Sequence, residues 1–153
     1  MRAILALALL ALASASAALA EDPVLDQKVR RFLERNRGAW RDMNVPWADG
    51  QILHDLVVKG RHTRALEIGT STGHSSIWIA WGLSKTGGKL TTIEIDPSRH
   101  AEALRNFEEA GVNALVDARP AASLSDGDRI IRFLRDLKLA WEKGGEAERA
   151  NLV

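Results

Sequence analysis

Hydrophobic and polar positions along the chain follow the two periods that distinguish helices from strands. Short apolar runs over residues 64–68, 89–95 and 114–118 predict three β-strands. Between them, apolar residues at helical spacing predict helices over residues 74–84 and 98–110. Strands that alternate with helices are typical of a parallel sheet with right-handed crossovers, so the sequence predicts an α/β fold.

Further helices are predicted on both sides of this region. They cover residues 23–37, with Asp22 as the N-terminal cap, residues 50–59, and about 127–142. The apolar loop over residues 40–50 has two interpretations of equal weight. It could pack against the first helix, or it could form a lid over a ligand. We expect the periodic apolar residues to be buried, namely Ile52, Leu53, Leu56, Val57 and Val58 in helix 50–59 and Ala101, Leu104, Phe107 and Ala110 in helix 98–110.

Residues 1–20 have the composition of a secretory signal peptide. One arginine precedes an apolar stretch over residues 4–12, and the small residues Ala18 and Ala20 stand before Glu21. A membrane anchor is the alternative, although the apolar stretch is short for a membrane span. We therefore expect cleavage near Ala20 and export of the chain to the periplasm or the exterior.

Composition and charge exclude several classes of function. Hydrophobic residues make up 46% and charged residues 27% of the 153 residues, which indicates one globular domain. The formal net charge is +1 and there is no basic run, which argues against nucleic-acid binding. The chain has no cysteine, so disulfides, thiolate metal sites and cysteine nucleophiles are excluded.

The strongest candidate site is the glycine turn between the first strand and its helix. Gly69 and Gly73 permit backbone angles and a close approach that a side chain would block. The helix that follows presents free N–H groups at its N-terminus, and the second strand ends in the acid Glu94 about twenty residues later. This succession is typical of a nucleotide-binding half of an α/β fold. The dinucleotide pattern G-x-G-x-x-G is not met, because position 71 is Ser.

Several segments carry a resemblance to a known family. They are residues 67–75 (EIGTSTGHS) and 92–96 (TIEID), with residues 44–45 and 50–51 upstream. The chain resembles the class I S-adenosylmethionine-dependent methyltransferases, and among them the catechol and caffeoyl-CoA type O-methyltransferases, over about residues 40–118. The resemblance implies a Rossmann-like methyltransferase fold with its strands in the order 3-2-1.

The residues predicted to bind S-adenosylmethionine lie in and around the glycine turn. Ser71 and Ser75 could hydrogen-bond the methionine carboxylate at the helix N-terminus, and Glu94 could accept both ribose hydroxyls. The resemblance implies that Val45 lies over the methionine end of the cofactor and that Glu67 lies near its amino group. The predicted set is Val45, Glu67, Gly69, Ser71, Gly73, Ser75 and Glu94.

The acids and histidines also have structural interpretations. Glu67 could pair with a nearby arginine, and either Glu94 or Asp96 could cap the next helix. We assign the cap to Asp96 and the ligand role to Glu94. We interpret His54 as a surface or internally satisfied histidine and His74 as a solvent contact at a helix N-terminus, and neither as a catalytic base.

We divide the chain into a signal peptide (1–20), N-terminal helices with the lid-like loop (21–60), a cofactor-binding half (61–119), and a C-terminal helix and tail (120–153). After residue 119 the resemblance stops. The family uses Mg²⁺ or a similar cation, but neither its ligands nor a catalytic base is identified here. The first strand would be an unpaired apolar edge of the sheet. The last helix could cover this edge, or a second copy could pair with it in a homodimer. The third alternative, which we favour, is that the chain is truncated or rearranged.

Three functional hypotheses follow, in order of preference. The first is an S-adenosylmethionine-dependent O-methyltransferase acting on a hydroxyl of a small molecule, phenol-like by resemblance, in a shortened form that could be inactive. The second is an exported, non-catalytic interaction domain that kept the fold and lost the ligand. The third is an NAD-dependent oxidoreductase. It is disfavoured because the middle glycine of the G-x-G-x-x-G pattern is missing at position 71.

Overall fold

The computed structural model describes residues 22–40 and 44–121. The predictions for the signal peptide over residues 1–20 and for the helix over residues 127–142 lie outside the described residues and stay predictions. Among the described helices, none has both the length and the apolar character needed to cross a membrane.

Three parallel strands form the sheet that positions the glycine turn. They are β1 (Arg64–Ile68), β2 (Lys89–Glu94) and β3 (Val116–Pro120), in the order β1-β2-β3. Read from the other edge, this is the predicted order 3-2-1, which is confirmed. The third strand begins two residues later than predicted, because residues Asn113–Leu115 form a 3₁₀ turn before it.

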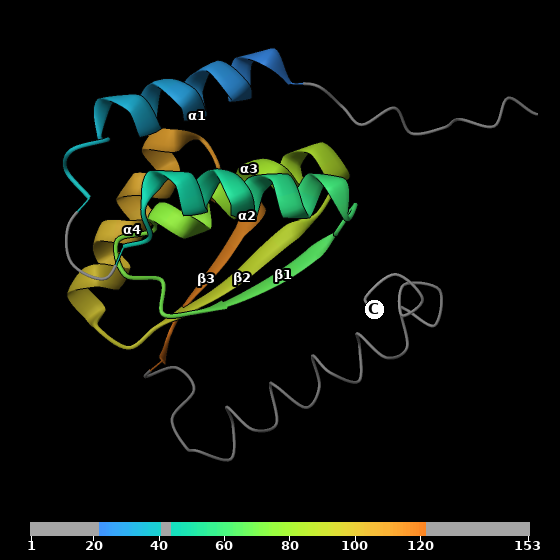
Figure 1. Ribbon diagram of the computed structural model, residues 1–153. Helices are drawn as coiled ribbons and strands as arrows, with labels where there is room; N and C mark the ends of the chain where they lie inside the picture. Colours follow the sequence, from blue (N-terminus) through green and yellow to red (C-terminus); the bar gives the residue numbers. More distant parts are fainter. Residues whose placement is uncertain (1–21, 41–43, 122–153) are drawn as a thin grey trace, which may run out of the picture.

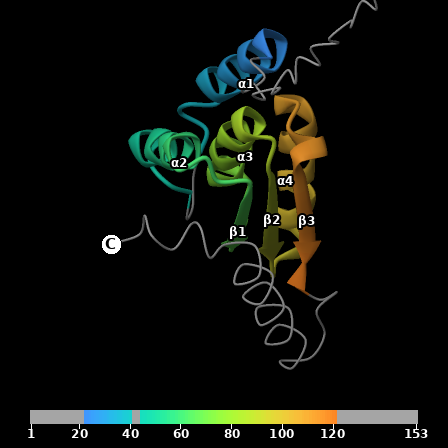
Figure 2. The same cartoon turned by 90° about the vertical axis from the view of Figure 1, so that its right-hand side faces the viewer.

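The helices lie on one side of this sheet in two tiers (Figures 1 and 2). Helices α3 (His74–Thr86) and α4 (Pro97–Ala110) are the crossovers, and α2 (Trp47–Lys59) continues their layer beside α3. Helix α1 (Pro23–Arg35) lies above them, farther from the sheet. The predicted caps are confirmed, since the Asp22 carboxylate accepts hydrogen bonds at the start of α1 and the Asp96 carboxylate does so at the start of α4.

Helix α2 differs from its prediction in its start and in its buried face. It begins at Trp47 after Pro46, three residues before the predicted start at Gly50. Ile52 and Leu56 are exposed by 56% and 57%, contrary to the prediction, whereas Val57 is buried. The reason is that α2 packs sideways against α3, where Gly82 allows close contact: a Cβ there would lie 2.9 Å from the carbonyl oxygen of His54.

The buried face of α4 is also shifted from its prediction. Ala103, Phe107 and Ala110 are buried, while Ala101 is exposed and Leu104 is 45% exposed. The buried residues follow i, i+4, i+7 spacing, whereas the predicted row followed i, i+3, i+6 and drifted off the face. Phe107 lies beneath Gly73, so this face of α4 supports the glycine turn directly.

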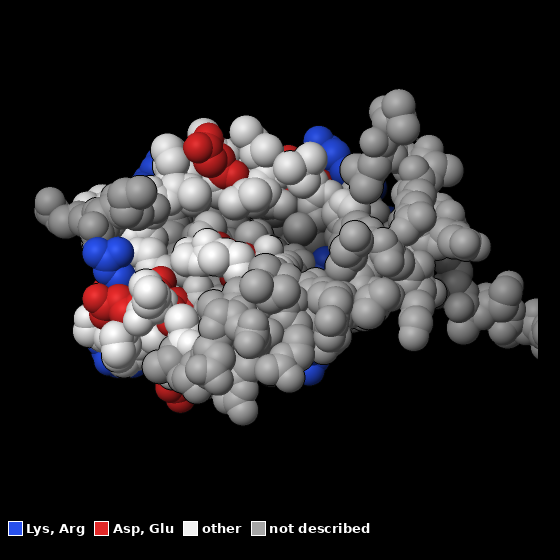
Figure 3. Space-filling model, turned by 90° about the horizontal axis from the view of Figure 1, so that it is seen from below, with Lys and Arg blue, Asp and Glu red and all other residues white. Residues whose placement is uncertain are grey.

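The larger core cluster lies among the helices and β3. Its members are buried apolar residues from α1, α3, α4 and the segment after α4, namely Val29, Phe32, Leu33, Ile77, Trp78, Ala80, Trp81, Ala103, Phe107, Ala110 and Val112. Acidic and basic side chains are interspersed on the face shown in Figure 3, in keeping with the small net charge.

Candidate functional site

The glycine turn connects the carboxyl end of β1 to the start of α3. Gly69, Ser71 and Gly73 all have positive φ, of 91°, 49° and 94°. A Cβ on Gly69 would meet nothing within 4 Å, whereas a Cβ on Gly73 would lie 2.6 Å from Phe107. Gly69 therefore leaves open space above the turn, and Gly73 allows the turn to sit on α4.

Glu94 holds this turn from the end of β2. Its side chain is buried, and its carboxylate accepts hydrogen bonds from the backbone N–H groups of Ser71 at 2.6 Å and of Asp96 at 2.9 Å. The hydroxyl of Ser71 is buried and has no hydrogen-bond partner among the described residues. The structure thus brings Ser71 and Glu94 together beside the open space at Gly69, as expected for residues of one ligand site.

Glu67 lies in a cluster of hydroxyl groups. Its carboxylate accepts hydrogen bonds from Ser75 at 2.5 Å, from Thr92 at 2.7 Å and from Ser76. The alternative that Glu67 pairs with an arginine is wrong, because hydroxyl groups are its partners. The Ser75 proton is directed at Glu67, so in this geometry Ser75 has no proton left for a ligand carboxylate.

The segment before α2 is fastened across the glycine turn. The side-chain amide of Asn44 donates to the Thr72 hydroxyl at 2.9 Å, and His74 Nδ1 lies 2.9 Å from the backbone oxygen of Val45. Asn106 of α4 donates to the backbone oxygen of Thr72 at 2.8 Å. Val45, which was predicted to contact the cofactor, is therefore placed next to the turn.

His74 is the residue that the sequence interpretation missed. It is 1% exposed, stacks on Trp40 with 4.4 Å between ring centroids, and accepts a hydrogen bond at Nε2 from the indole N–H of Trp78 at 3.0 Å. The prediction of a solvent contact is wrong, because Trp40 folds back over the ring from far along the chain. Since the indole N–H only donates, Nε2 is unprotonated and Nδ1–H donates to the Val45 backbone oxygen. Burial lowers the pKa of His74, and the bond to Val45 offsets this only in part.

His54 is half-buried on α2, on the far side of Trp78. Its Nδ1 lies 3.1 Å from the Asp55 carboxylate, while its Nε2 is buried and has no hydrogen-bond partner in the part of the chain that the structure describes. The interpretation of His54 as an internally satisfied histidine therefore holds for one nitrogen only. Among residues 22–40 and 44–121, no group of three or more histidines and acids is placed to hold a metal ion.

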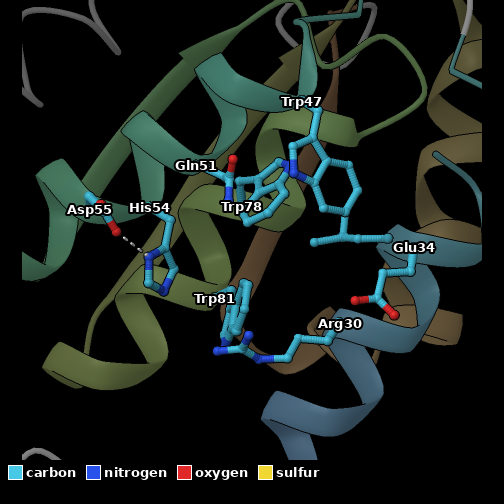
Figure 4. Close-up of a pocket in the computed structure, with 9 residues that line it drawn as sticks. Arg30, Glu34, Trp47, Gln51, His54, Asp55, Trp78 and Trp81 are labelled. Carbon is cyan, nitrogen blue, oxygen red and sulfur yellow. Dashed lines mark hydrogen bonds and ion pairs between the residues drawn. The ribbon is translucent and has the colours of Figure 1, made fainter.

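A separate cavity of about 280 Å³ lies among α1, α2 and α3 (Figure 4). Three indoles line it, those of Trp47, Trp78 and Trp81. None of the residues predicted to bind the cofactor lines this cavity. The hydrophobic pattern indicated that these helices pack together, but spacing within one helix could not show that three of them leave a space between them.

The sequence model of the O-methyltransferase family matches residues 13–135. The chain belongs to this family. The match extends past both ends of the range 40–118 over which the resemblance was seen. A catechol O-methyltransferase of Niastella koreensis is 36% identical over 75 residues, which are 49% of this chain and 34% of that protein. The chain therefore spans about a third of the length of that curated relative.

Solved structures show the same fold. An O-methyltransferase of Klebsiella pneumoniae, described as putative, superposes with a TM-score of 0.52 and 38% identity, covering 74% of this chain and 51% of that one. The O-methyltransferase of Bacillus cereus, in complex with S-adenosylhomocysteine (SAH), has a TM-score of 0.50 and 29% identity, with 69% and 46% covered. The predicted Rossmann-like methyltransferase fold is confirmed.

Two alanine substitutions separate backbone strain from crowding in the glycine turn. Gly69→Ala and Gly73→Ala each place an L-residue at positive φ, which costs about 1–2 kcal/mol. Gly73→Ala also crowds Phe107, and overpacking adds about 1–3 kcal/mol. We expect Gly73→Ala to lower the free energy of unfolding in urea clearly more than Gly69→Ala, with the exposed Gly38→Ala as control. Equal losses would show that α4 yields to the new methyl group.

The buried His74 should make stability depend on pH in a defined window. Its pKa in the folded chain lies below the unfolded value of 6.5, so the unfolded chain binds the proton more tightly. Its contribution is complete above pH 6.5 and is lost as the pH falls towards the folded pKa, by up to about 1.4 kcal/mol per pH unit.

We expect urea titrations between pH 7 and about pH 5 to show this loss in the native chain and a smaller one in His74→Phe, which keeps a ring against Trp40. Asp26 and Asp96 do not interfere, because their pKa values are lowered from 3.8 and their contributions are lost only at more acid pH. The same pH dependence in both proteins would contradict the assignment.

Proposed function

We propose that this O-methyltransferase chain binds S-adenosylmethionine at the glycine turn and serves methyl transfer to a hydroxyl group of a small molecule. The observation that carries the proposal is the buried hydroxyl of Ser71, which has no hydrogen-bond partner within residues 22–40 and 44–121 and lies beside the buried Glu94 and the open space at Gly69. Buried polar atoms in native proteins are almost always hydrogen-bonded, so this one calls for a ligand. The SAH complex of the Bacillus cereus relative supports the same choice of ligand.

The residues around the turn suit the parts of this cofactor. Each Glu94 oxygen accepts one backbone hydrogen bond and keeps a free lone pair, which suits ribose hydroxyls. The first turn of α3 carries no side-chain cap, so its N–H groups suit the methionine carboxylate. We assign that role to these N–H groups in place of the Ser75 hydroxyl. The negative Glu67, held by hydroxyl groups, suits the methionine ammonium group.

When bound, the cofactor supplies the methyl group, and the chain's own residues hold and orient it. Val45 and Asn44 are fastened over the turn by His74 and Thr72, so this segment would cover the methionine end. A divalent cation is expected from the family resemblance, but the described residues offer no fitting cluster of ligands, so no step is derived through it. The name of the Niastella koreensis relative favours a catechol-like phenol as the acceptor.

Glu94→Gln should weaken SAH binding. The variant keeps an acceptor for the backbone N–H of Ser71 but loses the charge and the acceptor for the backbone N–H of Asp96. Hydrogen bonds to charged groups contribute about 1.5–3 kcal/mol. We expect at least about a fivefold increase in Kd by titration calorimetry. The matched control is Glu102→Gln on the exposed face of α4, which should bind as the native chain does.

Thermal melts of each variant show whether a loss of binding is a loss of folding. Native affinity in a folded Glu94→Gln variant would refute the ribose assignment. A folded native chain that binds no SAH would favour the non-catalytic interaction domain, and selective binding of NAD in the same titration would favour the oxidoreductase.

A further inference from the structure

The cavity among α1, α2 and α3 has walls that are already fixed in orientation. Trp47 and Trp78 meet edge to face, at 5.1 Å between centroids and 89°, and Trp81 follows at 5.6 Å from Trp78. The indole N–H groups of Trp78 and Trp81 are bonded within the protein, to His74 and to Asp26. Since those N–H groups are satisfied elsewhere, the two rings offer apolar carbon surface to the cavity.

Asp26 contributes to this fixation. Its carboxylate accepts hydrogen bonds from the Trp81 indole at 2.7 Å and from the Lys85 ammonium group. Burial raises its pKa, but the hydrogen bonds from Lys85 and Trp81 outweigh burial and hold the pKa below 3.8. Asp26 therefore stays charged at neutral pH, and the wall at Trp81 is held in place before any ligand arrives.

The α1 side of the cavity carries two opposite charges that do not neutralise each other. Arg30 and Glu34 are one helical turn apart, a spacing at which an ion pair commonly forms. Instead, the Arg30 guanidinium lies over the Trp81 ring at 4.9 Å from its centroid. The Glu34 side chain makes no hydrogen bond or ion pair with any described residue, and Figure 4 shows it pointing into the space between Arg30 and Trp47.

We propose that this cavity is a second small-molecule site, for a zwitterion with a flat apolar group such as a free aromatic α-amino acid. The indoles would take the ring, Arg30 the carboxylate and Glu34 the ammonium group. Asp26 lies within electrostatic range of Arg30, but no ion pair between them is found among the described residues. A ligand that carries both charges can offer a carboxylate to Arg30 and an ammonium group to Glu34 at the same time. The cavity volume of about 280 Å³ accommodates such a molecule.

The test compares three probes that share a phenyl ring and differ in charge. L-Phenylalanine carries both charges, 3-phenylpropanoate only the carboxylate, and phenethylamine only the ammonium group. We expect the full 153-residue chain to bind L-phenylalanine saturably, with a Kd on the order of 1 mM or below, in calorimetry and in tryptophan fluorescence. The two single-charge probes should bind at least about threefold more weakly.

Three variants assign the contributions. Arg30→Met should weaken the binding of L-phenylalanine and 3-phenylpropanoate and leave the binding of phenethylamine unchanged or tighter. Glu34→Gln should weaken the binding of L-phenylalanine and phenethylamine and leave the binding of 3-phenylpropanoate unchanged or tighter. Trp47→Leu removes a wall and should weaken all three probes alike. Arg31→Met on α1 and Glu102→Gln on α4, which do not line the cavity, are the controls and should change nothing.

The proposal is overturned if a sample with a cooperative thermal melt shows no saturable binding of L-phenylalanine up to about 10 mM. It is equally overturned if the three probes bind alike, or if Arg30→Met and Glu34→Gln leave their ranking unchanged. SAH is titrated into the same samples, so the result at the cavity is read independently of the result at the glycine turn.

Discussion

The structure depends on two carboxylates at the carboxyl ends of β1 and β2, of which Glu94 is buried and Glu67 is half-buried. A buried carboxylate is tolerated only when hydrogen-bond donors surround it. Glu94 accepts hydrogen bonds from the backbone N–H groups of Ser71 and Asp96, and Glu67 accepts them from side-chain hydroxyls. The Ser71 donor for Glu94 depends on the left-handed angles of the glycine turn, and the Ser75 and Ser76 donors for Glu67 depend on where α3 begins. The shape of the candidate site is therefore a condition of folding.

The sheet register extends this constraint into the turn. The backbone N–H groups of Gly69 and Thr70 both donate to the Ile93 carbonyl oxygen, at 2.8 and 3.2 Å, so β1 stays joined to β2 past its last residue. The Thr70 hydroxyl lies 2.6 Å from that of Thr92, which in turn donates to Glu67. One continuous set of hydrogen bonds thus runs from the strand pairing to the first turn of α3, and it holds the turn in one shape before any ligand binds.

The sequence predicted those parts of the fold that local chemistry marks. β1 matches its prediction because a charged residue begins it and Gly69 follows it, and the caps at Asp22 and Asp96 are recognisable because each precedes a proline. The wrong predictions concern residues whose burial is decided by contacts with segments distant in the sequence. Exposure of Ile52 and Leu56 depends on how α2 docks on α3, which helical spacing alone does not reveal.

In the candidate site, the sequence interpretation of His74 was wrong for the same reason. Gly69, Ser71 and Glu94 stand out in the sequence because strand ends and glycines mark them, and the structure brings them together. His74 looked like a solvent contact because nothing near it in sequence covers it. Trp40, which buries it, and Val45, to which it donates, come from a separate segment before α2.

Trp78 joins the two sites that the structure separates. One edge of its indole lines the cavity among α1, α2 and α3, and its N–H donates to His74, which in turn donates to the backbone of Val45 beside the glycine turn. This relay requires neutral His74, because a proton on Nε2 would set two N–H donors against each other. Protonation of Nε2 would therefore remove the bond that holds Trp78, a wall of the cavity, while the Nδ1–H bond to Val45 remains. The two sites share a single conformational constraint although they share no predicted ligand-binding residue.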